Sequence, residues 1–208
     1  YGNGLIGTYR VRTDDFIPAA TVDETHLATE YCIGLEARWE GNYASYNQNV
    51  TLPAGNYKLT FDVENVNAGT NNATYNNLFK VTVGETVYTD ESTEWMKGKS
   101  AWTSHAIRFI LAEEATVNIS LGFGTGSNNF GHANTPALYV SHMALGTFDP
   151  MADSKEIALK AVDALPVGDD LFMYPEAAIT TAKGAIESAT TVDEVNAALA
   201  TAKAAQSK

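Results

Sequence analysis

Aromatic and amide side chains alternate in the polar stretches of this chain between about residues 40 and 135. This mixture suits a carbohydrate, because the apolar face of a sugar ring stacks on an aromatic ring while planar amides donate to and accept from its hydroxyls. The alternative is that the asparagines satisfy turn geometry and the aromatic rings pin the loops to a scaffold. The candidate ligand-binding residues are Trp95, Trp102, Tyr75, Asn128, Asn129, Phe130, His132 and Tyr43.

Trp95 is the preferred stacking platform among these residues. It lies in the polar stretch 90–102, which Trp102 closes. That stretch is far longer than a typical loop of about four to six residues, and such length usually accompanies function or disorder.

Catalytic chemistry has little support in the sequence. Asp90, Glu91 and Glu94 fall in one stretch, whereas the two carboxylates of a glycosidase must flank the scissile bond. The four histidines show no HxxxH or HxH spacing, and the chain has no Gly-x-Ser-x-Gly nucleophile elbow. We therefore predict a non-catalytic module, with a glycoside hydrolase as the less favoured alternative.

A structural calcium ion is a further hypothesis, because jelly rolls can hold a hard cation with carboxylates and backbone carbonyls. Asp23, Glu24 and Asp149 would supply the ligands where the first and last strands meet. The sequence contains no EF-hand pattern, and no other cofactor is expected.

Composition excludes two classes of partner. The chain carries 13 Lys and Arg against 25 Asp and Glu, a net charge of −12, and its cations are not clustered, so we predict no nucleic-acid binding. No apolar run approaches the roughly 18 residues of a membrane span, so no direct membrane insertion is expected.

Cys32, the single cysteine, lies in an apolar run and is expected to be a buried thiol. The chain begins at Tyr1 without an initiator Met or a signal peptide, which indicates a mature or excised fragment. Because the helical pattern ends at Lys208 without a stop signal, we expect a truncation from a larger polypeptide with flanking domains.

Strict alternation of apolar and polar residues indicates half-buried antiparallel strands at 57–63, 79–83, 107–111 and 117–123. Further strands are expected at 5–12, 31–39, 45–52 and 137–145. We therefore predict a mainly β fold in which residues 1–149 form an antiparallel β-sandwich or jelly roll of about eight strands.

Short and long connections alternate along this part of the chain. Tight turns are expected at 53–56, around Gly84 and at 113–114. Long polar loops are expected at 40–44, 67–76, 90–102 and 124–135. If successive strands run antiparallel, the two kinds of connection lie at opposite ends of the sandwich, and the candidate ligand-binding residues gather at one of them.

The pattern changes to a helical period after Asp149-Pro150, so residues 150–208 are predicted to form a small three-helix bundle. Asp153 is expected to cap a first helix with Glu156 at its third position, and Pro175 suits the first turn of a second. Thr191 and Glu194 form a capping box for a third helix. The expected apolar faces are Ile157, Ala161 and Leu165, then Ile179, Ala182, Ile186 and Ala189, then Val195, Leu199 and Ala202.

Two stretches of the first segment carry a family resemblance. The sequence LPAGNYKLTF at 52–61 and the sequence ALYVSHMAL at 137–145 resemble strands of galactose-binding-domain-like jelly rolls. That superfamily includes many carbohydrate-binding modules of bacterial extracellular enzymes and surface glycan-handling proteins. Where its closing strand often carries an acidic pair, this chain has Ser141-His142.

The helical segment is similar, around 185–199, to the FIVAR-type three-helix repeats of bacterial surface proteins and secreted glycan-degrading enzymes. Such repeats act as spacers or interaction modules. The two resemblances imply a secreted or cell-surface bacterial protein whose partner is an oligo- or polysaccharide. The alternative is a structural or protein-interaction module that orients a neighbouring domain.

Overall fold

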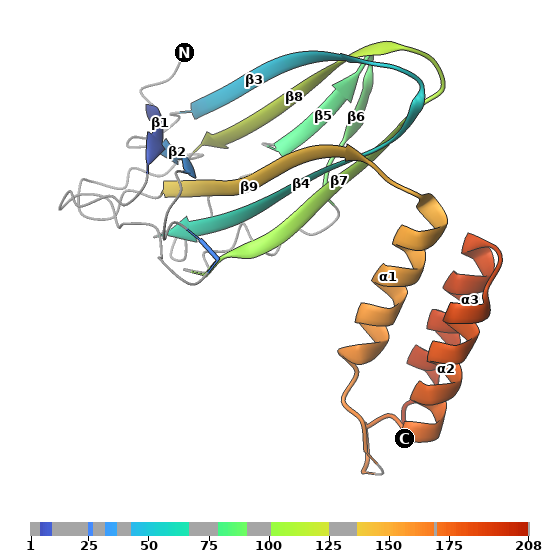
Figure 1. The fold of residues 1–208 in the computed structure, drawn as a ribbon. Coiled ribbons are helices and arrows are strands. Elements are labelled where there is room, and N and C mark those ends of the chain that lie inside the picture. Colours follow the sequence, from blue (N-terminus) through green and yellow to red (C-terminus); the bar gives the residue numbers. More distant parts are fainter. Residues whose placement is uncertain are drawn as a thin grey trace. The chain divides into compact units, whose positions relative to one another are not determined.

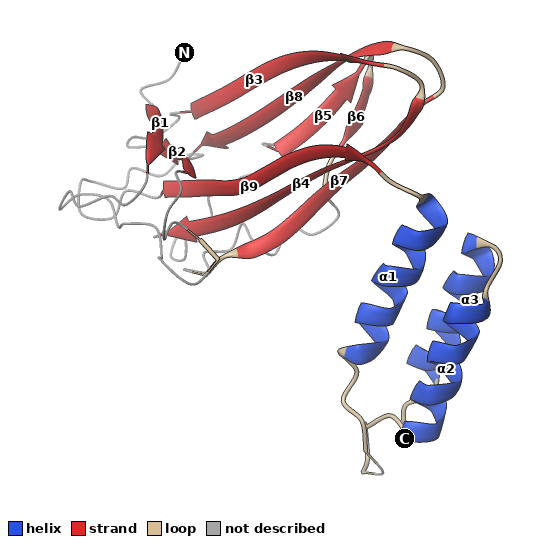
Figure 2. Ribbon diagram, in the orientation of Figure 1, coloured by secondary structure: helices blue, strands red, loops and turns tan. Residues whose placement is uncertain are grey.

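The computed structural model describes residues 5–9, 25–26, 32–36, 43–66, 79–90, 101–124, 137–168 and 170–207 (Figure 1). The chain divides into two compact units, Tyr1–Thr147 and Phe148–Lys208. The first is built of antiparallel sheets and the second of helices (Figure 2), which confirms the predicted fold class.

The first unit is a sandwich of two sheets. Its strands are β1 (Leu5–Tyr9), β2 (Cys32–Glu36), β3 (Tyr43–Leu52), β4 (Gly55–Val66), β5 (Phe79–Val83), β6 (Thr86–Tyr88), β7 (Thr103–Leu111), β8 (Ala115–Gly124) and β9 (Ala137–Thr147). The five-stranded sheet has the order β1-β2-β9-β4-β7, and the four-stranded sheet has the order β3-β8-β5-β6. The described part therefore holds nine strands where about eight were expected, since β6 is too short to show a period of two.

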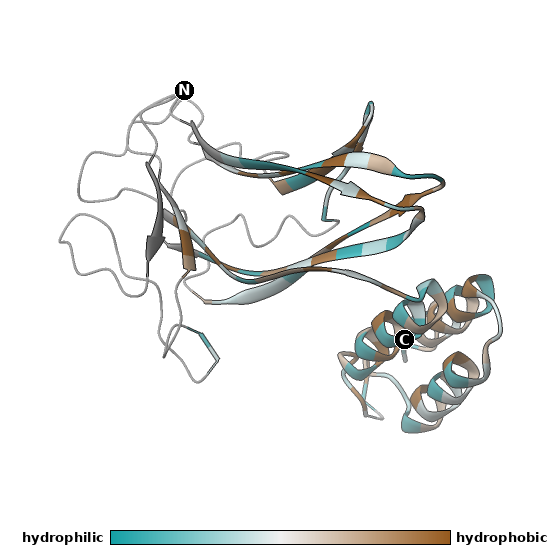
Figure 3. Ribbon diagram, turned by 45° about the horizontal axis from the view of Figure 1, so that its top comes forward, coloured by the Kyte–Doolittle hydropathy of each residue, from teal (hydrophilic) through white to brown (hydrophobic). Residues whose placement is uncertain are grey.

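The hydrophobic core lies between the two sheets. Alternate residues of β4, β7 and β8 are buried there, as alternation predicts, and Figure 3 shows the resulting change between apolar and polar positions. The core residues are Tyr57, Leu59, Phe61, Val63, Phe79, Val81, Ile107, Phe109, Leu111, Val117, Ile119, Leu121, Leu138 and Val140. Cys32 is buried as well, as expected.

Strand pairing confirms that short and long connections separate. The β3–β4, β5–β6 and β7–β8 connections are short. At the other end, Val66 at the end of β4 pairs with Ala137 at the start of β9, and Tyr43 at the start of β3 pairs with Gly124 at the end of β8. The strand ends that flank residues 67–78 and 125–136 therefore lie at the end of the sandwich opposite the tight turns.

The second unit contains α1 (Pro150–Asp163), α2 (Glu176–Ser188) and α3 (Val192–Ala204). The predicted core positions of α2 are confirmed, since Ile179, Ala182, Ile186 and Ala189 are all buried. In α3, Val195 and Ala202 are buried and Leu199 packs against the same cluster. Among the described residues, no helix is both long and apolar enough to cross a lipid bilayer.

The predicted start of the first helix is wrong. Asp149, rather than Asp153, caps α1, and its carboxylate accepts hydrogen bonds from the backbone N–H groups of Met151 and Ala152. Pro150 explains the shift, because its fixed φ and missing N–H suit the first helical position. Pro175 likewise stands just outside α2, at the cap position.

The predicted apolar face of α1 is also displaced. Ile157 is 46% exposed, whereas Ala158 and Val162 are buried against the other two helices. The buried face is therefore turned by one residue, or about 100° around the helix axis. Leu165 lies close enough to this face to pack against the core.

The capping box of α3 is confirmed and gives a testable prediction. The Thr191 hydroxyl accepts from the Glu194 backbone N–H at 3.2 Å, and the Glu194 carboxylate accepts from the Thr191 backbone N–H at 3.2 Å. Replacing Thr191 by alanine is expected to cost about 1 kcal/mol of helix stability. Native-state hydrogen exchange of the α3 amides would measure this loss. Thr201→Ala is the control, because Thr201 lies in the helix interior and caps nothing; equal loss of protection in both variants would contradict the prediction.

Candidate functional site

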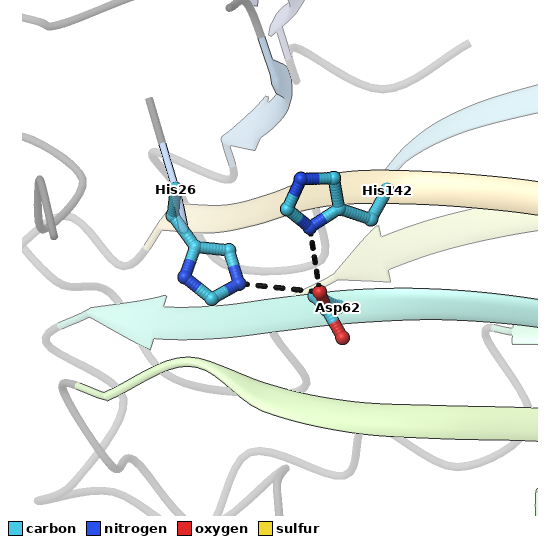
Figure 4. Close-up of side chains that lie close together, drawn as sticks. All are labelled: His26, Asp62 and His142. Atoms are coloured by element: carbon cyan, nitrogen blue, oxygen red, sulfur yellow. Dashed lines mark hydrogen bonds and ion pairs between the residues drawn. The ribbon is translucent and has the colours of Figure 1, made fainter. Parts of the chain in front are cut away.

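Two histidines and an aspartate meet on the outer face of the five-stranded sheet (Figure 4). The odd residues of β4 enter the core, so Asp62 lies on the opposite face of that strand. His142 comes from β9, the neighbour of β4, and His26 comes from a short described stretch before β2. We refer to His26, Asp62 and His142 as the histidine–aspartate cluster.

A β-bulge places His142 in this cluster. Thr60 pairs with Ala144 and Asp62 pairs with Ser141, so one residue of β4 faces two of β9. His142 occupies the left-handed region with φ of 48°, which is uncommon for a residue other than glycine. In a regular pleat the residue after Ser141 would point into the core. The bulge instead turns the imidazole onto the outer face, and such devices recur beside functional sites.

Asp62 is the centre of the cluster. Its Oδ2 lies 3.2 Å from His26 Nε2 and 2.8 Å from His142 Nδ1. Burial raises the pKa of Asp62, but hydrogen bonds with Ser104, His142 and His26 and the charge of His26 outweigh burial, so the pKa falls below its ordinary 3.8. The carboxylate is therefore ionised at neutral pH.

Trp102 adjoins the cluster through His26. The indole and the imidazole stack with ring centroids 4.5 Å apart and planes inclined by 5°. The imidazole of His26 also has a polar neighbour, because Thr25 Oγ1 lies 2.9 Å from its Nδ1. Trp102 remains partly exposed just before β7, so an aromatic surface lies beside an ionised carboxylate.

A second polar network fixes the start of β7. His105 Nδ1 lies 2.6 Å from Asp90 Oδ2, and its Nε2 lies 2.8 Å from Thr103 Oγ1. Carboxylate, imidazole and hydroxyl follow in the order used by nucleophilic hydrolases. However, the Thr103 hydroxyl donates to the Val63 carbonyl at 3.2 Å, and only 6% of the His105 side chain is exposed. The network therefore anchors β7 to β4 rather than presenting a nucleophile.

Three of the sequence-predicted site residues lie within the described part of the chain. Trp102 precedes β7, Tyr43 begins β3, and Asp149 caps α1. The others lie outside the described residues, so their predicted roles stay predictions: Trp95, Tyr75, Asn128, Asn129, Phe130, His132, Asp23 and Glu24.

Sequence reasoning missed the histidine–aspartate cluster. One signal for it was available on β9, where Leu138 and Val140 point inward and position 142 falls in the same phase. A histidine at an inward position of a core strand indicates a break in the alternation. His26 and Asp62 offered no comparable signal, because their meeting depends on chain segments 36 residues apart.

The comparisons with known proteins show only distant likeness. No known protein-family model matches the chain, and no curated protein matches it. A solved structure described as "CBM4 structure and function" is 11% identical, with 69% of this chain and 94% of that chain covered and a TM-score of 0.32. The crystal structure of a beta-glucosidase from Kluyveromyces marxianus in complex with glucose is also 11% identical, with 76% of this chain but 17% of that chain covered and a TM-score of 0.24.

Proposed function

We propose that this chain is a non-catalytic carbohydrate-binding module of a secreted or cell-surface bacterial protein. The observation that carries the proposal is the partly exposed Trp102 ring held against His26, beside the ionised Asp62. A sugar needs this pairing, because its C–H face stacks on an aromatic ring and its hydroxyls donate to a carboxylate. Trp95, Tyr75, Tyr43 and the residues of 128–132 named above would complete the site.

The rigid scaffold supports this role. Trp102 immediately precedes β7, which pairs with β4 over nine residues from Val63–Thr103 to Gly55–Leu111. The long connections begin and end at the same end of the sandwich, where binding loops on a rigid fold are commonly found. Stacking plus a few hydrogen bonds in an open site should give a Kd of about 10 μM to 1 mM.

A glycan array followed by titration calorimetry tests this proposal. We expect binding to at least one class among plant, host and bacterial glycans, and no release of chromophore from chromogenic glycosides. Silence across all three classes would contradict the proposal. Hydrolysis that disappears in Glu94→Gln would instead support a glycoside hydrolase.

An observation in the helical unit favours the alternative function, that of a protein-interaction module. In the connection between α1 and α2, Leu171 and Phe172 are 59% and 65% exposed. Phe172 is held in place, since its N–H donates to the Ser207 carbonyl and its carbonyl accepts from Gln206 Nε2. Fixed, exposed apolar side chains suit a protein contact. Sedimentation velocity of the chain and of Phe172→Ser tests it: self-association that weakens in the variant favours this role, and monomers at all concentrations count against it.

A further inference from the structure

We infer that His26, Asp62 and His142 form a binding site for a single divalent transition-metal ion, with Zn²⁺ as the preferred occupant. The three ligand atoms, His26 Nε2, His142 Nδ1 and one Asp62 carboxylate oxygen, all lie within 4.8 Å of one another. They come from three segments far apart in the chain, which the fold brings to one point (Figure 4). This inference rests on the cluster alone and does not depend on carbohydrate binding.

The two distances from the Asp62 carboxylate to the imidazoles are close to those around a tetrahedral ion, and the two imidazole nitrogens lie within 4.8 Å of each other. Bonds of about 2.0–2.1 Å from Zn²⁺ to nitrogen and oxygen require ligand atoms about 3.3 Å apart. The distances to Asp62 Oδ2 are 3.2 Å from His26 Nε2 and 2.8 Å from His142 Nδ1. A metal ion would take the place of the protons in these two hydrogen bonds, so each nitrogen would turn its lone pair to the metal. The fourth position would be left to water or to a hydroxyl of a bound molecule, as in zinc sites with three protein ligands.

The surroundings of the cluster orient two of the three ligands, His26 and Asp62. Thr25 Oγ1 lies 2.9 Å from His26 Nδ1, so with a metal ion in place of the Nε2 proton His26 can keep its remaining proton on Nδ1 and donate it to this hydroxyl. Trp102 stacks on the same imidazole and fixes its plane. The Ser104 hydroxyl bonds the Asp62 carboxylate. Hydrogen bonds of this kind set the tautomer and direction of metal ligands in known sites.

The bulge gives an independent reason to expect a ligand at this point. His142 holds a left-handed backbone conformation that few residues other than glycine adopt, and the observed result is an imidazole directed at Asp62. A hydrogen bond to a carboxylate could come from a serine or an asparagine on a regular strand. A metal ligand must instead aim one nitrogen at one point, which makes the displaced backbone useful.

The ligand set selects the class of metal. Imidazole nitrogens suit zinc, copper, nickel and iron, whereas calcium and magnesium prefer sets made of oxygen alone. Two neutral imidazoles and one carboxylate would leave a charge of +1 on a bound divalent ion, which the chain's net charge of −12 favours over long range.

Titration calorimetry of the full chain, stripped of metal with EDTA and then dialysed, tests the inference with ZnCl₂ as the probe. We expect one ion per chain, a Kd of about 10 μM or tighter, and a higher melting temperature in the presence of zinc. Co²⁺ should bind at the same place and show the intense visible absorption of a tetrahedral ion. Calcium should not compete.

Two variants locate the ion. His142→Asn keeps a residue that tolerates positive φ but removes the imidazole, and Asp62→Asn keeps the shape but removes the charge. Each should weaken zinc binding by at least tenfold, and the matched control Glu114→Gln, an exposed carboxylate in the tight turn before β8, should not change it.

Three outcomes would overturn the inference: no zinc binding by the wild-type chain at about 100 μM, a Kd unchanged in both variants, or a cobalt spectrum without tetrahedral bands. If His142→Asn does not fold, Asp62→Asn and the wild-type cobalt spectrum still decide. Because the titration contains no sugar, its failure would leave carbohydrate binding untouched.

Discussion

Replacing Phe109 by alanine is expected to destabilise the sandwich by about 3–5 kcal/mol, because the change removes a large buried ring and leaves a cavity. Phe109 is 1% exposed and lies on β7, with its ring centroid 5.5 Å from Tyr57 and 6.0 Å from Tyr88. This loss is a large part of the free energy of unfolding of a typical domain, which is about 5–15 kcal/mol. Urea unfolding followed by tryptophan fluorescence would measure the change.

The adjacent residue provides a matched control. Ile110 follows Phe109 on β7 but points out of the sandwich and is 60% exposed. Ile110→Ala is expected to change the free energy of unfolding by no more than about 0.5 kcal/mol. Equal effects at the two positions would mean that β7 does not have the register with β4 in which Tyr57 faces Phe109.

Replacing Trp102 by alanine is expected to weaken glycan binding by about 1–3 kcal/mol, or roughly 5- to 150-fold in Kd, by analogy with aromatic rings that stack on bases. The cost to folding should be smaller. Trp102 is partly exposed, and its stacking on His26 is worth about 0.5–1.5 kcal/mol. Calorimetric titration with the best glycan from the array, together with melting temperatures, would separate the two effects.

Trp102→Phe is the control for this change, because it keeps a flat apolar ring on His26 and should retain most of the affinity. If Trp102→Ala unfolds the sandwich, the indole is a core residue. If it leaves glycan affinity unchanged, the binding surface lies elsewhere. Either result would remove Trp102 from the proposed site.

The sheets could be predicted because the alternation of apolar and polar residues along a strand shows which of its faces is buried. Leu59, Phe61 and Val63 alternate with polar residues, and their burial in the core follows from the pleat alone. The capping box at Thr191 is equally local. The start of α1 shows where local reasoning fails. Asp149 and Asp153 could each cap the helix, and Pro150 between them favours Asp149 because it suits the first helical position.

The histidine–aspartate cluster could not be predicted in the same way. In the sequence Asp62 looks like any other outward-facing residue of β4, and its partners His26 and His142 lie 36 and 80 residues away along the chain. The cluster forms only with the observed β4–β9 register and the bulge within it, and neither can be derived from the local sequence pattern. The aromatic and amide pattern predicted Trp102 as a ligand-binding residue, but not that His26 would stack against it.

The way the chain leaves the sandwich has a mechanical consequence. The last residue of β9, Thr147, pairs with Tyr57 near the tight-turn end, so tension from the following segment would enter through β9. This strand lies inside its sheet, hydrogen-bonded to β2 on one side and β4 on the other. Because ladder bonds run across the strands, a pull along β9 would load many of them at once in shear. A glycan held near Trp102, toward the opposite end, would thus be tethered through a strand well suited to resist stretching.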